Sequence, residues 1–264
     1  MKIYKALTIA GSDSGAGAGI QADLKTFAAL GVYGTSVITA ITAQNTIEVT
    51  RIFELSPDLI AAQIDAVISD IGADALKTGM LANAAIIEIV AEKIRQHRLT
   101  NLVVDPVMVA KSGDLLLRPE AIAALKSRLI PLAAIVTPNL PEAEQLTGIQ
   151  MTGPRELKEA ARRIVGMGAG SVVIKGGHKE GPATDLFFDG EKFRQLSAAR
   201  IRTANTHGTG CTFSAAIAAN LAKGEKLERA LAHAKSYITQ AIRQGFAVGA
   251  GHSPVNHFYR LWKT

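Results

Sequence analysis

The sequence predicts one doubly wound α/β domain built on a mainly parallel sheet. Short β-branched runs alternate with longer segments of helical periodicity, and polar, glycine or proline residues end each run. No linker, internal repeat or low-complexity segment interrupts the 264 residues. We therefore expect a single domain over residues 1–264, with ligands at the carboxyl ends of its strands.

The expected elements follow one another along the whole chain. Short apolar, β-branched runs predict strands over residues 6–10, 36–42, 75–78, 102–105, 134–137 and 171–175. Longer periodic segments predict helices over residues 20–30, 57–71 (amphipathic), 83–96, 119–129, 154–165, 211–223 (rich in alanine) and 227–244. Asp189-Gly190 predicts the turn of a hairpin between the last predicted strand and these final helices.

The composition excludes several classes of protein. With 48% hydrophobic residues and no glycine period, the chain is neither disordered nor collagen-like. Its single cysteine excludes an internal disulfide and a cysteine-based zinc site, and fits a reducing compartment. The net charge of +6 is scattered, which argues against nucleic-acid binding. The longest uncharged stretch, residues 26–47, is too polar to cross a membrane, so we expect a cytoplasmic protein.

Two glycine-rich segments are candidate anion sites. Residues 11–19 (GSDSGAGAG) follow the first strand and open a helix, so their backbone amides can approach an anion or a flat ring. They match neither the dinucleotide fingerprint nor a P-loop. A tight turn that needs positive φ explains the same glycines equally well.

Residues 207–212 (HGTGCT) form the second candidate, at the start of the alanine-rich helix. Successive amides there bind phosphate or an oxyanion. A thiol in the first helical turn is expected to have a lowered pKa, which would make Cys211 a base or nucleophile. The alternative, a small packed apolar residue, remains open.

Charged side chains at predicted strand ends form a third set. Asp105 and Glu142 are suited to hold Mg²⁺, mostly through water, and Lys175 can meet a nucleotide phosphate. Glu142 lies in a proline-bounded turn that looks poorly suited to packing. Each carboxylate has a structural alternative as a helix cap or loop residue, and Lys175 as a solvated charge. His178 and His207 remain undecided loop histidines.

Together these segments resemble the hydroxymethylpyrimidine and hydroxymethylpyrimidine phosphate kinases of thiamine biosynthesis, a branch of the ribokinase-like superfamily. The matching stretches are residues 6–14 (ALTIAGSDS), 19–26 (GIQADLKT), 42–46 (TAQNT), 77–81 (KTGML), 105–108 (DPVM), 137–143 (TPNLPEA) and 207–214 (HGTGCTFS). They run in order over nearly the whole chain. The resemblance implies a three-layer sandwich around a mainly parallel sheet, phosphate transfer from ATP with Mg²⁺, and a homodimer.

The resemblance also assigns expected roles to residues. It implies a catalytic anion turn of Gly208, Thr209, Gly210 and Cys211; substrate contacts from Gln44, Gly11, Asp23, Met80 and Val107; nucleotide contacts from Asn139, Lys175 and Thr209; and metal contacts from Asp105 and Glu142. The wider superfamily usually has aspartate at the position of Cys211. That departure puts the strength of base catalysis at this position in question.

Gln44 decides the expected substrate. In the kinases that this chain resembles, a glutamine after the second strand pairs with the aminopyrimidine edge, and its amide offers a donor and an acceptor together. The resemblance thus implies phosphorylation of 4-amino-5-hydroxymethyl-2-methylpyrimidine to its monophosphate and then to its pyrophosphate. Pyridoxal kinase is the alternative within the class. A thiol hydrolase using Cys211 and His207, and a non-catalytic pyrimidine sensor, are the alternatives outside it.

Overall fold

A computed structural model describes residues 2–109, 116–176 and 181–262. The described residues form one sheet in the order β3-β2-β1-β4-β5-β6-β7-β8-β9. Its strands are β1 (Lys5–Asp13), β2 (Tyr33–Gln44), β3 (Val49–Glu54), β4 (Ala75–Thr78), β5 (Leu102–Val104), β6 (Ile135–Val136), β7 (Val172–Ile174), β8 (Ala183–Phe188) and β9 (Phe193–Ala198). The helices are α1 (Gly19–Ala29), α2 (Pro57–Asp70), α3 (Ala84–Gln96), α4 (Ala121–Ala124), α5 (Leu140–Thr147), α6 (Pro154–Gly166), α7 (Thr209–Ala222) and α8 (Leu227–Arg243).

The sheet is mainly parallel, as predicted. Strands β2, β1, β4, β5, β6 and β7 pair in parallel, whereas β3 at one edge and the β8–β9 hairpin at the other pair antiparallel. The chain passes from β1 to β2 on one side and then returns to place β4 on the other side of β1. Such a reversal opens a crevice at the carboxyl ends of the two flanking strands, here β1 and β4.

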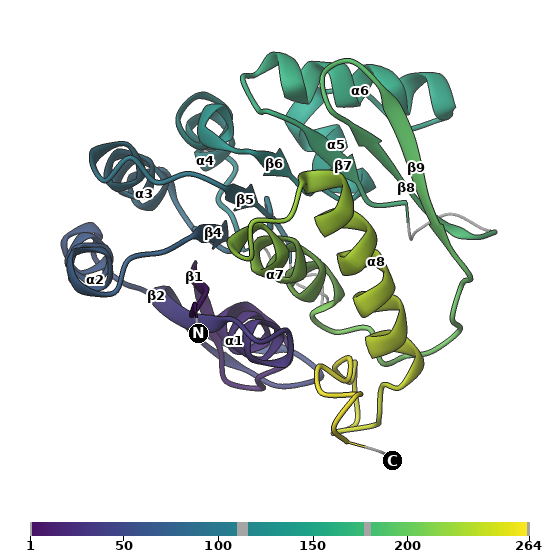
Figure 1. Cartoon of the computed structure of the whole chain (residues 1–264), viewed down its shortest axis with the longest axis horizontal. Coiled ribbons are helices and arrows are strands. Elements are labelled where there is room, and N and C mark those ends of the chain that lie inside the picture. The colour runs from purple at the N-terminus through teal and green to yellow at the C-terminus, as the bar shows by residue number, and fades with distance from the viewer. Residues whose placement is uncertain (1, 110–115, 177–180, 263–264) are drawn as a thin grey trace.

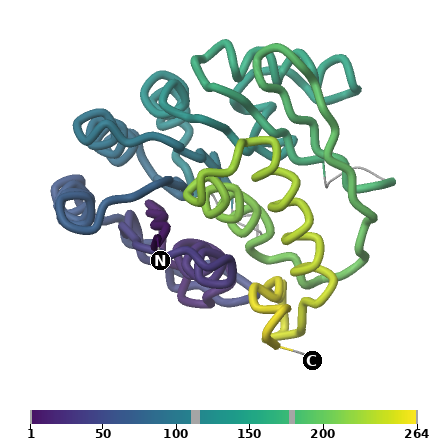
Figure 2. The backbone as a smooth tube through the Cα atoms, in the orientation of Figure 1, coloured from purple at the N-terminus to yellow at the C-terminus, as the bar shows by residue number. Residues whose placement is uncertain are grey.

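Helices cover both faces of the sheet, which confirms the three-layer architecture (Figures 1 and 2). One core packs α2, α3, α5 and α6 against one face, and the other packs α1, α7 and α8 against the opposite face. Neighbouring strand residues alternate between them, as Leu76 and Ala75 do in β4. The alanine-rich α7 is buried on nearly all sides, because its small side chains let it lie close against the sheet.

The structure differs from the predicted local structure at three elements. The edge strand β3 was not predicted, because most of its side chains are exposed and its sequence shows no buried run. The helix α5 was not predicted because Pro138 and Pro141 look like loop residues. The helix predicted over 119–129 is a short α4 that continues as a π-helical segment, Leu125–Leu129.

Candidate active site

The carboxyl ends of the parallel strands and the first turn of α7 meet around one buried carboxylate. Asp105, which follows β5, is 2% exposed. Its Oδ1 accepts hydrogen bonds from Lys175 Nζ at 3.0 Å and Thr137 Oγ1 at 3.2 Å, and its Oδ2 accepts one from Ser214 Oγ at 3.2 Å. Burial alone would raise the pKa of Asp105, but Lys175 and Lys77 hold it below its ordinary value. The carboxylate therefore stays charged at neutral pH.

The glycine turn before α7 lies directly against this pair. A Cβ at Gly210 would stand 3.2 Å from Lys175 Nζ and 3.8 Å from Asp105 Oδ2. Gly208, the N-cap of α7, has a φ of +74°. The Thr209 hydroxyl donates to the Thr206 carbonyl at 2.7 Å. The structure thus brings the predicted anion turn, whose backbone N–H groups suit phosphate at a helix N-terminus, together with a lysine and a carboxylate.

Asn139 and Glu142 open helix α5 beside Lys175. The Asn139 N–H donates to Glu142 Oε2 at 2.7 Å and the Glu142 N–H donates to Asn139 Oδ1 at 2.8 Å, which forms a capping box. Burial raises the pKa of Glu142 to about 7, although Lys175 opposes the shift. The expectation of a loosely packed turn was wrong: Glu142 is buried and fixes a helix.

Burial determines the protonation state of the single thiol, Cys211. It raises the pKa of Cys211 to about 11, although Lys77 and the Gly19 N–H act in the opposite direction. The predicted lowering was therefore wrong, because the loss of solvent outweighs the favourable field of the helix N-terminus. Cys211 is a neutral thiol at physiological pH in this structure.

Three of the residues expected to contact the substrate lie in or just after neighbouring parallel strands: Gly11 in β1, Met80 after β4 and Val107 after β5. A Cβ at Gly11 would stand 3.0 Å from Met80 Sδ, so this glycine and Met80 are in contact. Val107, two residues beyond Asp105, is half-buried, and its N–H donates to the Asp105 carbonyl. Asp23 differs: it has no exposed surface, and its Oδ2 accepts from Lys77 Nζ at 2.9 Å. Asp23 therefore lies behind the crevice rather than in it.

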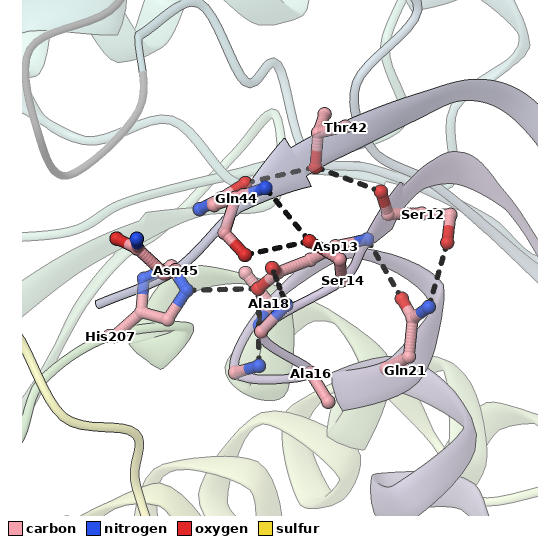
Figure 3. A network of polar contacts seen from close by, with 12 residues as sticks. Ser12, Asp13, Ser14, Ala16, Ala18, Gln21, Thr42, Gln44, Asn45 and His207 are labelled. Carbon is pink, nitrogen blue, oxygen red and sulfur yellow. Dashed lines mark hydrogen bonds and ion pairs between the residues drawn. The ribbon is translucent and has the colours of Figure 1, made fainter. Parts of the chain in front are cut away.

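Gln44 is the last residue of β2 and is held through its backbone. Ser14 Oγ donates to the Gln44 carbonyl at 2.6 Å and accepts from the Gln44 N–H at 2.8 Å (Figure 3). The side-chain oxygen of Gln44 accepts from Thr42 Oγ1 at 3.2 Å. The backbone pair with Ser14 thus fixes the position of Gln44 at the end of β2.

The amides of the first glycine loop bind an internal anion. Asp13 Oδ1 accepts from the Gly15 N–H at 2.8 Å, and Oδ2 accepts from the N–H groups of Gly17 at 3.1 Å and Ala18 at 2.8 Å (Figure 3). These amides are consequently not free for a phosphate. Of the two glycine-rich segments, the one that precedes α7 is the better anion site.

Several residues of the site were not singled out by sequence reasoning. Asp13, Lys77, Thr137 and Ser214 look like ordinary strand-end or helix residues, and only their positions inside the matching stretches set them apart. His207 was undecided, and its Nε2 lies 3.0 Å from Asp13 Oδ2. The undecided His178 lies outside the described residues.

The oxygen donors fit a magnesium ion held largely by water and phosphate. Among the described residues no group of three or more histidine, cysteine or acidic side chains could enclose a metal by itself. Asp105, next to the anion turn, and Glu142, near Lys175, carry hard oxygen donors of the kind that suits Mg²⁺, which is commonly bound by one or two carboxylates together with substrate phosphates. No helix in the described part of the chain is long and apolar enough to cross a membrane.

Comparison with known proteins agrees with this geometry. The family model for phosphomethylpyrimidine kinase matches residues 13–256. Hydroxymethylpyrimidine/phosphomethylpyrimidine kinases from Bacillus subtilis and Rhizobium meliloti are 52% and 55% identical to this chain, over 98% of it in both cases and over 96% and 98% of their own lengths. The thiamine biosynthesis bifunctional protein ThiED of Geobacter sulfurreducens is 54% identical over 95% of this chain and 51% of its own length.

Solved structures show the same fold. An ADP complex of Bacillus subtilis pyridoxal kinase superposes with a TM-score of 0.92 at 45% identity, covering 98% of this chain and all of the other. Staphylococcus aureus pyridoxal kinase in complex with AMP-PCP and pyridoxal gives 0.90 at 38% identity, covering 98% and 96% of the two chains. With the family match and the full-length relatives, these findings show that the chain belongs to the phosphomethylpyrimidine kinase family of phosphotransferases, on a ribokinase-like fold.

Proposed function

We propose that this enzyme phosphorylates 4-amino-5-hydroxymethyl-2-methylpyrimidine and then its monophosphate, with ATP as donor, in thiamine biosynthesis. The observation that carries the proposal is the contact of Gly210 with Lys175 and Asp105 at one end of the crevice, where phosphates would bind. Gln44 stands at the end of β2 beside the same crevice, and its amide suits an aminopyrimidine edge. The full-length relatives named for both activities support the assignment.

Charge neutralisation and positioning explain how one site performs both steps. Lys175 and the amides of Gly208 and Gly210 face the transferring phosphoryl group, where negative charge must be stabilised. The Thr209 N–H is bonded to the Thr206 carbonyl at 3.3 Å, so Thr209 would contribute through its hydroxyl. Asn139 supplies a further polar group beside Lys175 for the nucleotide. In the second step the nucleophile is an anionic phosphate oxygen, so the same alignment suffices without a base.

We include in this proposal a magnesium ion bound together with ATP. Asp105 and Glu142 would hold it, Asp105 as a permanent carboxylate and Glu142 after losing its proton. The ion would neutralise charge on the phosphates of ATP. Lys175 forms an ion pair with Asp105 at 3.0 Å, which keeps this one carboxylate charged.

Pyridoxal kinase is the second candidate, since two similar solved structures carry that name. A coupled ADP-release assay offering the pyrimidine alcohol, its monophosphate and pyridoxal side by side distinguishes the candidates. We expect kcat/KM for the pyrimidine alcohol to exceed that for pyridoxal by at least about tenfold. Equal values, or a preference for pyridoxal, would contradict the assignment of substrate.

We also propose a homodimer in the cytoplasm. Ile41 and Phe53 pair across β2 and β3, are 48% and 69% exposed, and offer an apolar surface at the edge of the sheet. A second copy of the chain would cover it. The cysteine is free in the structure, in keeping with a reducing compartment.

A further inference from the structure

One hydrogen-bonded pair joins the two glycine-rich loops, which are almost 200 residues apart in the sequence. His207 Nε2 lies 3.0 Å from Asp13 Oδ2, and both side chains are nearly buried (Figure 3). Asp13 ends β1, and His207 immediately precedes the glycine turn of α7. The pair therefore connects the substrate side of the crevice with the phosphate side.

Asp13 is the centre of its loop. Its carboxylate accepts three backbone N–H groups in addition to the imidazole, and its own N–H donates to Gln21 Oε1 at 2.9 Å. Although burial opposes ionisation, the bonds from His207 and from these amides lower the pKa of Asp13. Charge-assisted hydrogen bonds of this kind are about twice as strong as neutral ones. The loop is thus fixed around one carboxylate.

The two loops also lie in close contact at two glycines. A Cβ at Gly17 would stand 2.2 Å from His207 Cδ2, and a Cβ at Gly208 would stand 1.8 Å from the Gly17 carbonyl oxygen. Only glycine permits this approach at either position. A change in the position of the Asp13 loop is therefore transmitted directly to the turn that precedes Cys211.

The Gln44 segment is attached to the same unit by separate contacts. Ser14 holds the Gln44 backbone without using the Asp13 carboxylate. Two residues on, the carbonyl of Thr46 accepts from the His252 N–H at 2.7 Å, and the neighbouring Ser253 carbonyl accepts from the His207 N–H at 3.0 Å. Loss of the Asp13–His207 bond would therefore leave the pyrimidine contact in place while removing one of the contacts that hold the anion turn.

We propose that Asp13 is a positioning residue that, through His207, holds the Gly208–Cys211 turn in register with the bound substrate for phosphoryl transfer. This inference rests on the proposed places of the pyrimidine and the phosphates. A displacement of about 1 Å can cost about a hundredfold in rate. The expected signature is a loss in kcat with little change in KM.

The test uses single-turnover and steady-state rates of four single variants and one double variant, each checked by circular dichroism. His207→Leu removes the donor, His207→Gln retains an N–H donor, and Asp13→Asn leaves at least one loop N–H without an acceptor. Asp189→Asn is the matched control, because Asp189 accepts two backbone N–H groups in an exposed hairpin turn. It is expected to keep wild-type kinetics.

We expect His207→Leu and Asp13→Asn to lower kcat at least tenfold with KM for the pyrimidine and ATP changed less than threefold. His207→Gln should keep at least a third of kcat, and the double variant of Asp13→Asn with His207→Leu should lose no more than the worse single variant. Wild-type kcat in His207→Leu, equal losses in Leu and Gln variants, or multiplicative losses in the double variant would overturn the proposal.

The test still decides the positioning role if one variant does not fold or if the substrate is not the pyrimidine. If Asp13→Asn does not fold, the comparison of His207→Leu with His207→Gln decides the matter alone. If the wild-type enzyme turned over only pyridoxal, the proposed substrate would be wrong, and the same kcat comparison on pyridoxal would still test the positioning role.

Discussion

Cys211 shows that a helix N-terminus does not by itself create a thiolate. Its pKa of about 11 leaves very little of the anion at neutral pH, so base catalysis gains little from it. Phosphoryl transfer depends mainly on positioning and charge neutralisation. The anion turn then uses Cys211 for its size and its backbone.

We therefore expect Cys211→Ser to slow both phosphorylations by similar factors, less than about tenfold each. Single-turnover rates for the alcohol and for the monophosphate, measured from about pH 7 to pH 9, check this. A selective loss in the alcohol step, together with a wild-type rate for that step that rises tenfold per pH unit, would show the thiolate acting as a base.

Gln44 carries the proposed specificity. Gln44→Met removes the donor and acceptor while keeping the length of the side chain, and leaving ring nitrogens unpaired costs about 1 to 3 kcal/mol. We expect kcat/KM for the pyrimidine alcohol to fall about tenfold or more, with KM for ATP unchanged. The exposed Gln150→Met is the control. Unchanged kcat/KM in Gln44→Met would remove Gln44 from the pyrimidine contacts.

The raised pKa of Glu142 makes the stability of the folded protein depend on pH. Its pKa is raised to about 7, so between about pH 4.5 and pH 7 the folded protein holds a proton that the unfolded chain releases. The stability from this proton is complete below pH 4.5 and is lost as the pH rises through 7. We expect the Tm of the ligand-free wild type to fall from pH 5 to pH 8 by more than the Tm of Glu142→Gln.

The same variant tests the metal. Glu142→Gln keeps an oxygen for the Asn139 N–H in the capping box, whereas Glu142→Ala also loses about 1 kcal/mol of helix stability. Both should need more Mg²⁺ for half-maximal rate. Wild-type dependence on Mg²⁺ in both variants would exclude Glu142 as a ligand.

At the scale of elements, the N-terminus of α7 depends on one left-handed residue. Gly208→Ala would combine an unfavourable φ of +74° with a clash against the Gly17 carbonyl, whereas Gly224 has a φ of +80° and no neighbouring atom within 4 Å. Gly224→Ala therefore destabilises the fold only through its unfavourable backbone conformation, by about 1 kcal/mol. We expect Gly208→Ala to lower kcat at least about a hundredfold and Gly224→Ala to retain it. Similar kcat values would mean that the close approach has no catalytic role.

Strands and helices with a clear apolar pattern were predictable, and β4 was predicted with its observed bounds, Ala75–Thr78. Helix α5 was not, because its first turn contains Pro141 and its signal, Asn139 followed three residues later by Glu142, is a capping box that was interpreted as a metal-binding loop. The candidate site was predictable as a set of strand ends and matching stretches. The ionisation of Cys211 and the Asp13–His207 pair were not, because both depend on burial between segments distant in sequence.

For the whole molecule, the continuous sheet from β3 to β9 supports the proposal that residues 1–264 form one domain. Its exposed β3 edge supports the proposed dimer. Phe53→Glu places a charge on that surface and should shift sedimentation equilibrium toward the monomer, whereas Leu261→Glu, exposed near the C-terminus, should not. An unchanged mass for Phe53→Glu would place any dimer interface elsewhere.

In the proposed reaction, one site adds two phosphoryl groups in succession to the same pyrimidine. A ³¹P NMR time course with the purified enzyme, excess Mg-ATP and the pyrimidine alcohol tests it most directly. We expect a phosphomonoester signal that rises and then gives way to the paired signals of a pyrophosphate ester, with two ADP formed per pyrimidine. A reaction that stops at the monoester with one ADP, or that forms no phosphorylated pyrimidine, would contradict it.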